Sequence, residues 1–330
     1  MKTKTTGLKS IAFELGVSVN TVSRALRDCD DISKETKEKV RNKAIELGYL
    51  PSLTSQFIKK DENYLVAIIL DNFNNGFFVT VASKIVNIAS SNNLDYTFIY
   101  SQNKLGLDVI KQCISQRVDA IISLIEINEE IIDICKLNNI QIVSISKSVD
   151  SNEICEISTN NEKGAILASE FLFNEAKTNK FLYYGFDNVI NSKLRENSFK
   201  NKLKELDENN LIKSFYANKE DIDNIFIYLS EGYKNIFCYN DELAYHLLKY
   251  LHKADNNFLV NNKDFNIVGY DALSLRNEGL IDINSIDYDY DEMCLKAINY
   301  LLLKFNKTNL NLPSKIIIDV KLHKGTLFLH

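Results

Sequence analysis

The chain has 330 residues, 45% hydrophobic and 25% charged, with a formal net charge of −5. This is the composition of an ordinary globular protein that is long enough for two or three domains. No run of about 18 apolar residues occurs and no secretory signal precedes the first helix, so we expect a cytoplasmic protein without membrane contact. Six scattered cysteines without CxxC spacing indicate reduced buried thiols, and neither a metal nor another cofactor is expected.

The charge is unevenly distributed along the chain. The first 60 residues carry twelve lysines and arginines against seven acidic residues, whereas the remaining 270 carry 27 against 37. Attraction to phosphates is local, because salt screens it within about 10 Å. A basic head can therefore bind DNA although the chain as a whole is acidic.

Three short helices are predicted in this head. Apolar spacing predicts a helix over Leu8–Leu15, and Gly16 permits the tight turn "GVS" that ends it. Ser18 can cap a second helix over 19–27, and Ser33 a third that ends at Gly48. Helix, turn and helix with a polar outer face is the geometry that enters the DNA major groove, although a helical cap with a merely solvated face is the alternative.

A linker follows the head. Pro51 ends the preceding element, and Ser52 to Lys60 can form only a short helix, which is marginal in water by itself. In the free protein this segment is predicted to be a tether.

The remainder of the chain reads as two similar α/β halves. Apolar runs such as "YLVAIIL" and "VDAIISLI" alternate with amphipathic segments such as Phe78–Ala89 and Leu105–Ile114, and a second set begins at "KFLYYG". Continuous apolar runs between helices predict parallel sheets that are covered on both faces. Ligand sites then lie at the carboxyl ends of the strands.

Catalytic motifs are not found in the sequence. None of the four histidines belongs to an HExxH motif, and there is neither a GxSxG motif nor a phosphate-binding GxxxxGK[ST] loop. We therefore expect no enzyme, such as a sugar kinase. A ligand-binding protein without a DNA function remains the other alternative, but it would carry a secretion signal in place of the helix-turn-helix.

The segment "GVSVNTVSRAL…ISKETKEKVRNKAIELGYLPS" resembles the DNA-binding head of the LacI/GalR family of bacterial repressors. The resemblance implies that Val19, Asn20 and Arg24 face base edges, and that Ser18, Thr21 and Ser23 mainly meet phosphates. It also implies that the linker forms a hinge helix on DNA, in which Ile58 wedges into a base step beside Ser55 and Gln56.

Fragments of the body are similar to the same family: "NNGFF", "NNEKGA", "SKLRENSF", "CYND" and "VGYD". The resemblance implies two doubly wound, periplasmic-binding-protein-like subdomains. The implied divisions are a helix-turn-helix domain over 1–50, a hinge over 51–61 and a body over 62–330. Within the body, the first subdomain spans about 62–158 and 289–316, and the second about 159–288 and 317–330.

The resemblance also implies an effector cleft between these subdomains. Arg195 and Asp271 offer paired donors and acceptors that suit the adjacent hydroxyls of a sugar, and Phe186 and Tyr239 could stack on a ring. From the residues alone, a structural Arg195–Asp271 ion pair among core aromatics is the competing interpretation. The cleft residues implied are Asn75, Phe77, Asn160, Arg195, Asn240 and Asp271.

These features together predict a homodimeric transcription regulator that acts as a repressor. Its partners would be a pseudo-palindromic double-stranded DNA operator and a small-molecule effector, with a carbohydrate favoured over a nucleoside, a nucleobase or another metabolite.

Overall fold

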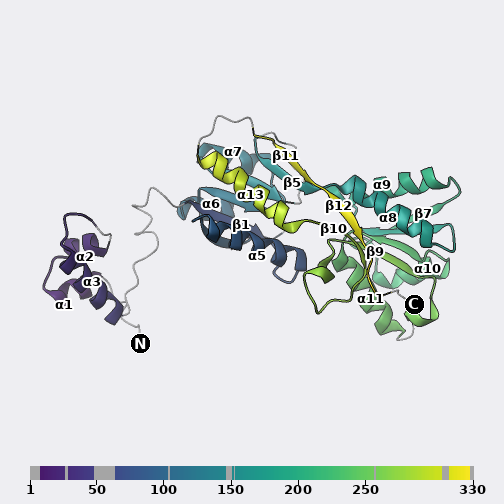
Figure 1. Ribbon diagram of the computed structural model, residues 1–330, viewed down its shortest axis with the longest axis horizontal. Coiled ribbons are helices and arrows are strands. Elements are labelled where there is room, and N and C mark those ends of the chain that lie inside the picture. Colours follow the sequence, from purple (N-terminus) through teal and green to yellow (C-terminus); the bar gives the residue numbers. More distant parts are fainter. Residues whose placement is uncertain are drawn as a thin grey trace. The chain divides into compact units, whose positions relative to one another are not determined.

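The computed structural model describes residues 8–26, 29–47, 64–102, 105–145, 151, 153–255, 258–306 and 312–327. The chain divides into two compact units, residues 1–63 and 64–330 (Figure 1). We refer to them as the head and the body and describe each by itself.

The described residues of the head form three helices, α1 (Leu8–Leu15), α2 (Val19–Leu26) and α3 (Lys34–Glu46). Gly16 adopts a φ of 63°, in the left-handed region that glycine enters at little cost, and this allows the chain to turn sharply after α1. The hydroxyl of Ser18 accepts a hydrogen bond from the Thr21 amide at 2.9 Å, so Ser18 caps α2 as predicted. Ser33 caps α3 in the same way, through the Thr36 amide.

The three helices enclose a small apolar core, which fixes the angle of α2 against its neighbours. Its fully or nearly fully buried members are Ile11, Ala12, Val22, Ala25, Val40 and Ala44. Because the apolar side chains of α2 point inward, the polar residues between them remain at the surface.

The body contains two six-stranded sheets (Figure 1). The first has the order β11-β5-β4-β3-β1-β2 and the second β12-β10-β9-β8-β6-β7. The strands of the first sheet are β1 (Leu65–Leu70), β2 (Asp95–Tyr100), β3 (Ala120–Ser123), β4 (Gln141–Ile145), β5 (Cys155–Thr159) and β11 (Lys315–Ile318). Those of the second are β6 (Lys180–Gly185), β7 (Leu211–Tyr216), β8 (Asn235–Cys238), β9 (Asn266–Tyr270), β10 (Asn284–Tyr288) and β12 (Val320–His323).

Helices cover both faces of each sheet, as continuous apolar strands require. On the first sheet α5 and α13 share one apolar cluster and α6 and α7 another; on the second, α8 and α9 lie opposite α10 and α11. The helices are α5 (Gly76–Ser91), α6 (Leu107–Ser115), α7 (Glu129–Leu137), α8 (Asn161–Glu175), α9 (Ile190–Leu206), α10 (Ile225–Ser230), α11 (Asp241–Ala254), α12 (Phe258–Asn261) and α13 (Tyr290–Phe305), with short 3₁₀ turns at Ile222–Asn224 and Leu273–Leu275.

The chain passes between the two sheets after β5, after β10 and at Asp319, which alone separates β11 from β12. The third passage lies slightly beyond the expected boundary after residue 316. The predicted doubly wound architecture is confirmed with one correction, because β12 pairs antiparallel with β10 whereas the other pairs are parallel. β10 ends where the chain leaves the second sheet for the first, and β12 begins where the chain returns directly from β11, so the two strands run in opposite directions.

The largest apolar cluster runs through both sheets, from Val66 and Phe77 in the first to Tyr183 and Tyr270 in the second. The two halves are therefore packed as one body. Among the described residues, no helix is both long enough and apolar enough to cross a membrane.

Candidate functional site

The exposed face of α2 is the first candidate site. Val19 is 41% exposed, Asn20 is exposed beside it, and Thr21, Ser23 and Arg24 are half-buried around the same helix. The Arg24 guanidinium lies 2.6 Å from the Asp31 carboxylate, an exposed ion pair within the head.

Part of the predicted DNA surface lies outside the described residues. This part comprises the expected hinge over 51–61, with Ser55, Gln56 and Ile58. Gly48, the expected end of the third helix, also lies outside the described residues. The roles proposed for them stay predictions.

The second candidate site is a cavity of about 180 Å³ between the two halves of the body. It lies at the carboxyl ends of the strands, where parallel sheets commonly hold ligands. Its lining includes five of the six residues expected there, and Asn160 is the exception. The full lining is Asn75, Phe77, Phe78, Thr159, Phe186, Val189, Asn191, Arg195, Tyr239, Asn240, Glu242, Asp271 and Tyr288.

Three of the expected cleft residues are helix N-caps. The Oδ1 atoms of Asn75 and Asn240 accept hydrogen bonds from the Phe77 and Leu243 amides at 2.9 and 3.0 Å. Asn160 caps α8 in the same manner through the Lys163 amide. Each cap satisfies an amide at the start of its helix, and the Nδ2 group of each of these asparagines is not used by the cap.

Arg195 is both a lining residue and part of the packing. Its side chain is nearly buried, with Nε donating to Asn161 Oδ1 at 2.7 Å and Nη1 to the Tyr239 carbonyl at 2.5 Å. The guanidinium lies 3.3 Å from the centre of the Tyr270 ring. Arg195 and Asp271, both described, form no ion pair, so neither of the two interpretations from the sequence describes this residue completely.

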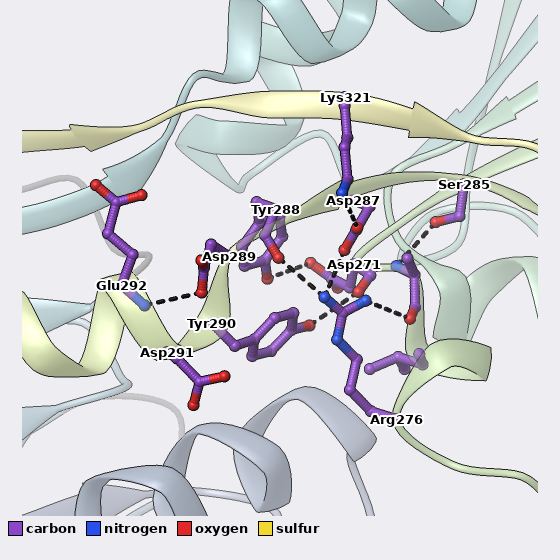
Figure 2. A network of polar contacts seen from close by, with 12 residues as sticks. Asp271, Arg276, Ser285, Asp287, Tyr288, Asp289, Tyr290, Asp291, Glu292 and Lys321 are labelled. Carbon is purple, nitrogen blue, oxygen red and sulfur yellow. Dashed lines mark hydrogen bonds and ion pairs between the residues drawn. The ribbon is translucent and has the colours of Figure 1, made fainter. Parts of the chain in front are cut away.

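Asp271 follows β9 in a strained backbone conformation, with a φ of 106°. Its carboxylate accepts a hydrogen bond from the Tyr288 hydroxyl at 2.9 Å, and its carbonyl accepts one from the Tyr290 hydroxyl at 3.0 Å (Figure 2). Burial raises the pKa of Asp271 to about 6, and the Arg195 charge opposes that rise. Tyr288 thus holds the carboxylate of this lining residue, and Tyr290 holds its backbone carbonyl.

Arg276 ties this loop to the strand where the chain changes sheets. It donates to the carbonyls of Ala272 and Tyr288 at 2.8 and 2.9 Å, and it forms an ion pair with Asp287 at 2.5 Å. Lys321 on β12 approaches the same carboxylate (Figure 2). Arg276 and Asp287 therefore link the loop of Asp271 to β10 and β12.

Sequence reasoning missed several lining residues, above all Glu242, Asn191 and Tyr288. Glu242 accepts a hydrogen bond from Asn75 Nδ2 at 2.5 Å, which joins α5 to α11 across the cavity. Its position directly after the "CYND" fragment was the available signal. In the described part of the chain, no cluster of His, Cys, Asp or Glu is arranged to hold a metal ion.

Residues 7–52 match the family described as "Bacterial regulatory proteins, lacI family". The HTH-type transcriptional regulator RegA of Clostridium saccharobutylicum is 24% identical, covering 94% of this chain and 96% of that protein. The ribose operon repressor of Lactococcus lactis is 25% identical over 82% of each. A crystal structure of the lac repressor dimer bound to operator shares the fold, with 18% identity, a TM-score of 0.73 and coverage of 98% and 99%.

The match of residues 7–52 agrees with the capped helix-turn-helix of the head. The nearly full-length structural match agrees with the two-sheet body. The members named above are transcription regulators rather than enzymes. Residues 7–52 of this chain thus match the lacI family of bacterial regulatory proteins, and over nearly its whole length the chain is similar to a transcriptional regulator.

Proposed function

We propose that the protein is a repressor that binds a specific operator through α2. Its affinity for the operator falls or rises when a small molecule occupies the cavity of the body. The single observation that carries the proposal is the capped helix-turn-helix, whose outward residues are those of a major-groove reader. On this proposal Asn20 and Arg24 contact base edges, and Ser18, Thr21 and Ser23 contact phosphates.

The effector is proposed to be a carbohydrate. Amide, guanidinium and carboxylate groups line a cavity that is also lined by the aromatic residues Phe186 and Tyr239, and this combination suits hydroxyl groups on a compact ring. The name of the ribose operon repressor supports the same class of ligand. Asn75, Phe77, Arg195, Asn240 and Asp271 are the proposed contacts, with Asn160 supporting α8 next to them.

A homodimer is the proposed assembly. Tyr96, Phe98 and Tyr100 lie on one face of β2, an edge strand, and are 41%, 42% and 55% exposed. Phe73 extends this aromatic surface, with its ring 6.4 Å from that of Phe98. Exposed aromatic surface on an edge strand favours contact with a second copy. Two heads would then read a pseudo-palindromic operator.

Removing Arg24 tests the DNA proposal. Arg24→Ala should weaken binding to an operator selected from random DNA by roughly ten- to hundredfold, because a bidentate base contact is lost. Binding is measured by fluorescence anisotropy at one salt concentration, with unrelated DNA in parallel. Lys39→Ala, which removes a cation from α3, is the matched control and should have a far smaller effect.

Asp31→Asn provides the opposite change, since it frees Arg24 from its ion pair. We expect this variant to bind the operator at least as tightly as the parent protein. Unchanged operator affinity in Arg24→Ala would refute the assignment of α2 as the reading helix.

A further inference from the structure

The charged groups of the cavity are unequally available to a ligand. Two of the three guanidinium nitrogens of Arg195 are bonded to Asn161 and to the Tyr239 carbonyl. In the described residues only Nη2 has no hydrogen-bond partner. Glu242 and Asp271, by contrast, both present carboxylates to the same space. The cavity therefore holds two acidic groups against one basic group that is already largely engaged.

Helix N-termini would ordinarily attract an anion into such a cavity. At α5 and α11, however, the Asn75 and Asn240 side chains already occupy amides of the first turn. Arg195 and Asn240, which both carry side-chain N–H donors, line the cavity. Helix α9 beside them begins at Ile190 without a side-chain cap. Donors for an anion are thus present, and the acidic groups decide whether one can enter.

Glu242 is the acidic group with least compensation. It accepts one hydrogen bond, from Asn75 Nδ2, and forms no ion pair with any described residue. Glu242 is an exposed residue that lines the cavity, and partial desolvation of its carboxyl group together with the nearby Asp71 carboxylate raises its pKa. Oδ1 of Asp71 is itself buried without a hydrogen-bond partner among the described residues. A phosphate or carboxylate entering here would meet this unneutralised charge at short range.

We propose that Glu242 determines the charge specificity of the cleft, restricting the effector to an uncharged polyol and excluding its phosphorylated or carboxylated counterparts. A ligand hydroxyl would donate to Glu242 in place of Asn75 Nδ2. This inference rests on the proposed effector function of the cavity, and it adds the class of ligand and the residue that selects it.

The test uses the full chain and three matched pairs of probes: ribose and ribose 5-phosphate, glucose and glucose 6-phosphate, and fructose and fructose 6-phosphate. Thermal shift identifies the pairs that bind, and calorimetry measures their affinities. For any pair that binds, we expect the uncharged sugar to be preferred at least about tenfold, and Glu242→Gln to reduce that preference at least about tenfold. Gln can still accept the hydrogen bond from Asn75, so the fold is retained.

Inorganic phosphate is titrated in parallel, and this measurement does not depend on the identity of the sugar. Phosphate should stabilise Glu242→Gln more than the parent protein, because the donors of the cavity then face one opposing carboxylate, that of Asp271, in place of two. Glu175→Gln, the same change at an exposed position on α8, is the control and should behave as the parent protein.

Each outcome bears on a separate claim. A parent protein that prefers the phosphorylated member of a pair overturns the charge selectivity and leaves the carbohydrate cleft standing. An unchanged preference and an unchanged phosphate response in Glu242→Gln overturn the role of Glu242. Failure of every sugar and sugar phosphate to bind at millimolar concentration rejects the carbohydrate cleft itself.

Discussion

Asp241 is a buried residue that connects the elements around the cleft. It lies in the first turn of α11 and is fully buried. Its carboxyl oxygens accept hydrogen bonds from the Ser285 hydroxyl at 2.6 Å and the Leu273 amide at 2.7 Å. Burial raises the pKa of Asp241 to about 8, and the Asp271 carboxylate adds to the effect. Asp241 thereby joins α11, β10 and the loop that carries Asp271.

This raised pKa predicts a pH-dependent stability. The folded state retains the Asp241 proton up to about pH 8, whereas the unfolded chain loses it near 4, so the unfolding free energy should fall as the pH rises through that window. Asp241→Asn removes this dependence, and its stability relative to the parent should increase with pH by at most about 1.4 kcal/mol per pH unit. Urea unfolding between pH 5 and 8 measures the slope.

Asn at position 241 can still accept from the Leu273 amide and can donate to the Ser285 hydroxyl, so the packing is preserved. Asp133→Asn, an exposed carboxylate on α7, is the control. Parallel slopes for Asp241→Asn and the parent protein would show that Asp241 is already ionised in the folded state.

At the scale of elements, α8 approaches the second sheet unusually closely through Gly164. A Cβ at that position would lie 2.6 Å from Cε2 of Tyr270 on β9, which is closer than side chains can tolerate. The Arg195 guanidinium lies over the ring of Tyr270, and the Tyr270 hydroxyl donates to Thr159 Oγ1 at 2.8 Å. The position of Arg195 in the cavity therefore depends on how closely α8 packs.

Gly164→Ala should lower the unfolding free energy by about 1–3 kcal/mol, because overpacking forces α8 or Tyr270 to move. Chemical denaturation measures the loss. Gly279→Ala is the matched control, since its added methyl would meet only Asn277 Oδ1, at 3.4 Å. Equal stability of Gly164→Ala and the parent protein would mean that the sheet and α8 adjust without cost, and that Arg195 is positioned by other contacts.

At the scale of the whole molecule, the proposed dimer makes function depend on a surface of the body outside the cavity. Phe98 lies at the centre of the exposed aromatic surface on β2, with its ring 6.0 Å from that of Tyr96. Two heads held together bind a two-part operator far more tightly than one head does. Loss of the dimer should therefore lower the affinity for the operator.

Phe98→Glu should raise the dimer dissociation constant at least about tenfold, because apolar contact area is replaced by two like charges across the symmetry axis. Light scattering on a dilution series measures this, and operator affinity should fall with it. Leu137→Glu, at an exposed apolar position on α7, is the control. A Phe98→Glu dimer as stable as the parent would place the interface elsewhere.

The sequence by itself determined the local features of this protein. Alternating apolar runs and amphipathic segments predicted both α/β halves, and Gly16, Ser18 and Ser33 marked the turn and the caps of the head. These features depend on neighbours within a few residues, so their chemistry can be recognised along the chain. Five of the expected cleft residues line one cavity for a related reason. Four lie at a strand end or helix start, Arg195 lies in the second turn of α9, and parallel sheets gather those ends together.

Only the tertiary structure decided what these residues face. The antiparallel pairing of β12, the exclusion of Asn160 from the cavity lining and the Asn75–Glu242 contact all join segments far apart in sequence. Arg195 also has a double role, because Tyr270, Asn161 and the Tyr239 carbonyl converge on it from three separate elements. Periodicity records which face of an element is buried, but it does not record which partner lies against that face, and the charge balance of the cleft depends on those partners.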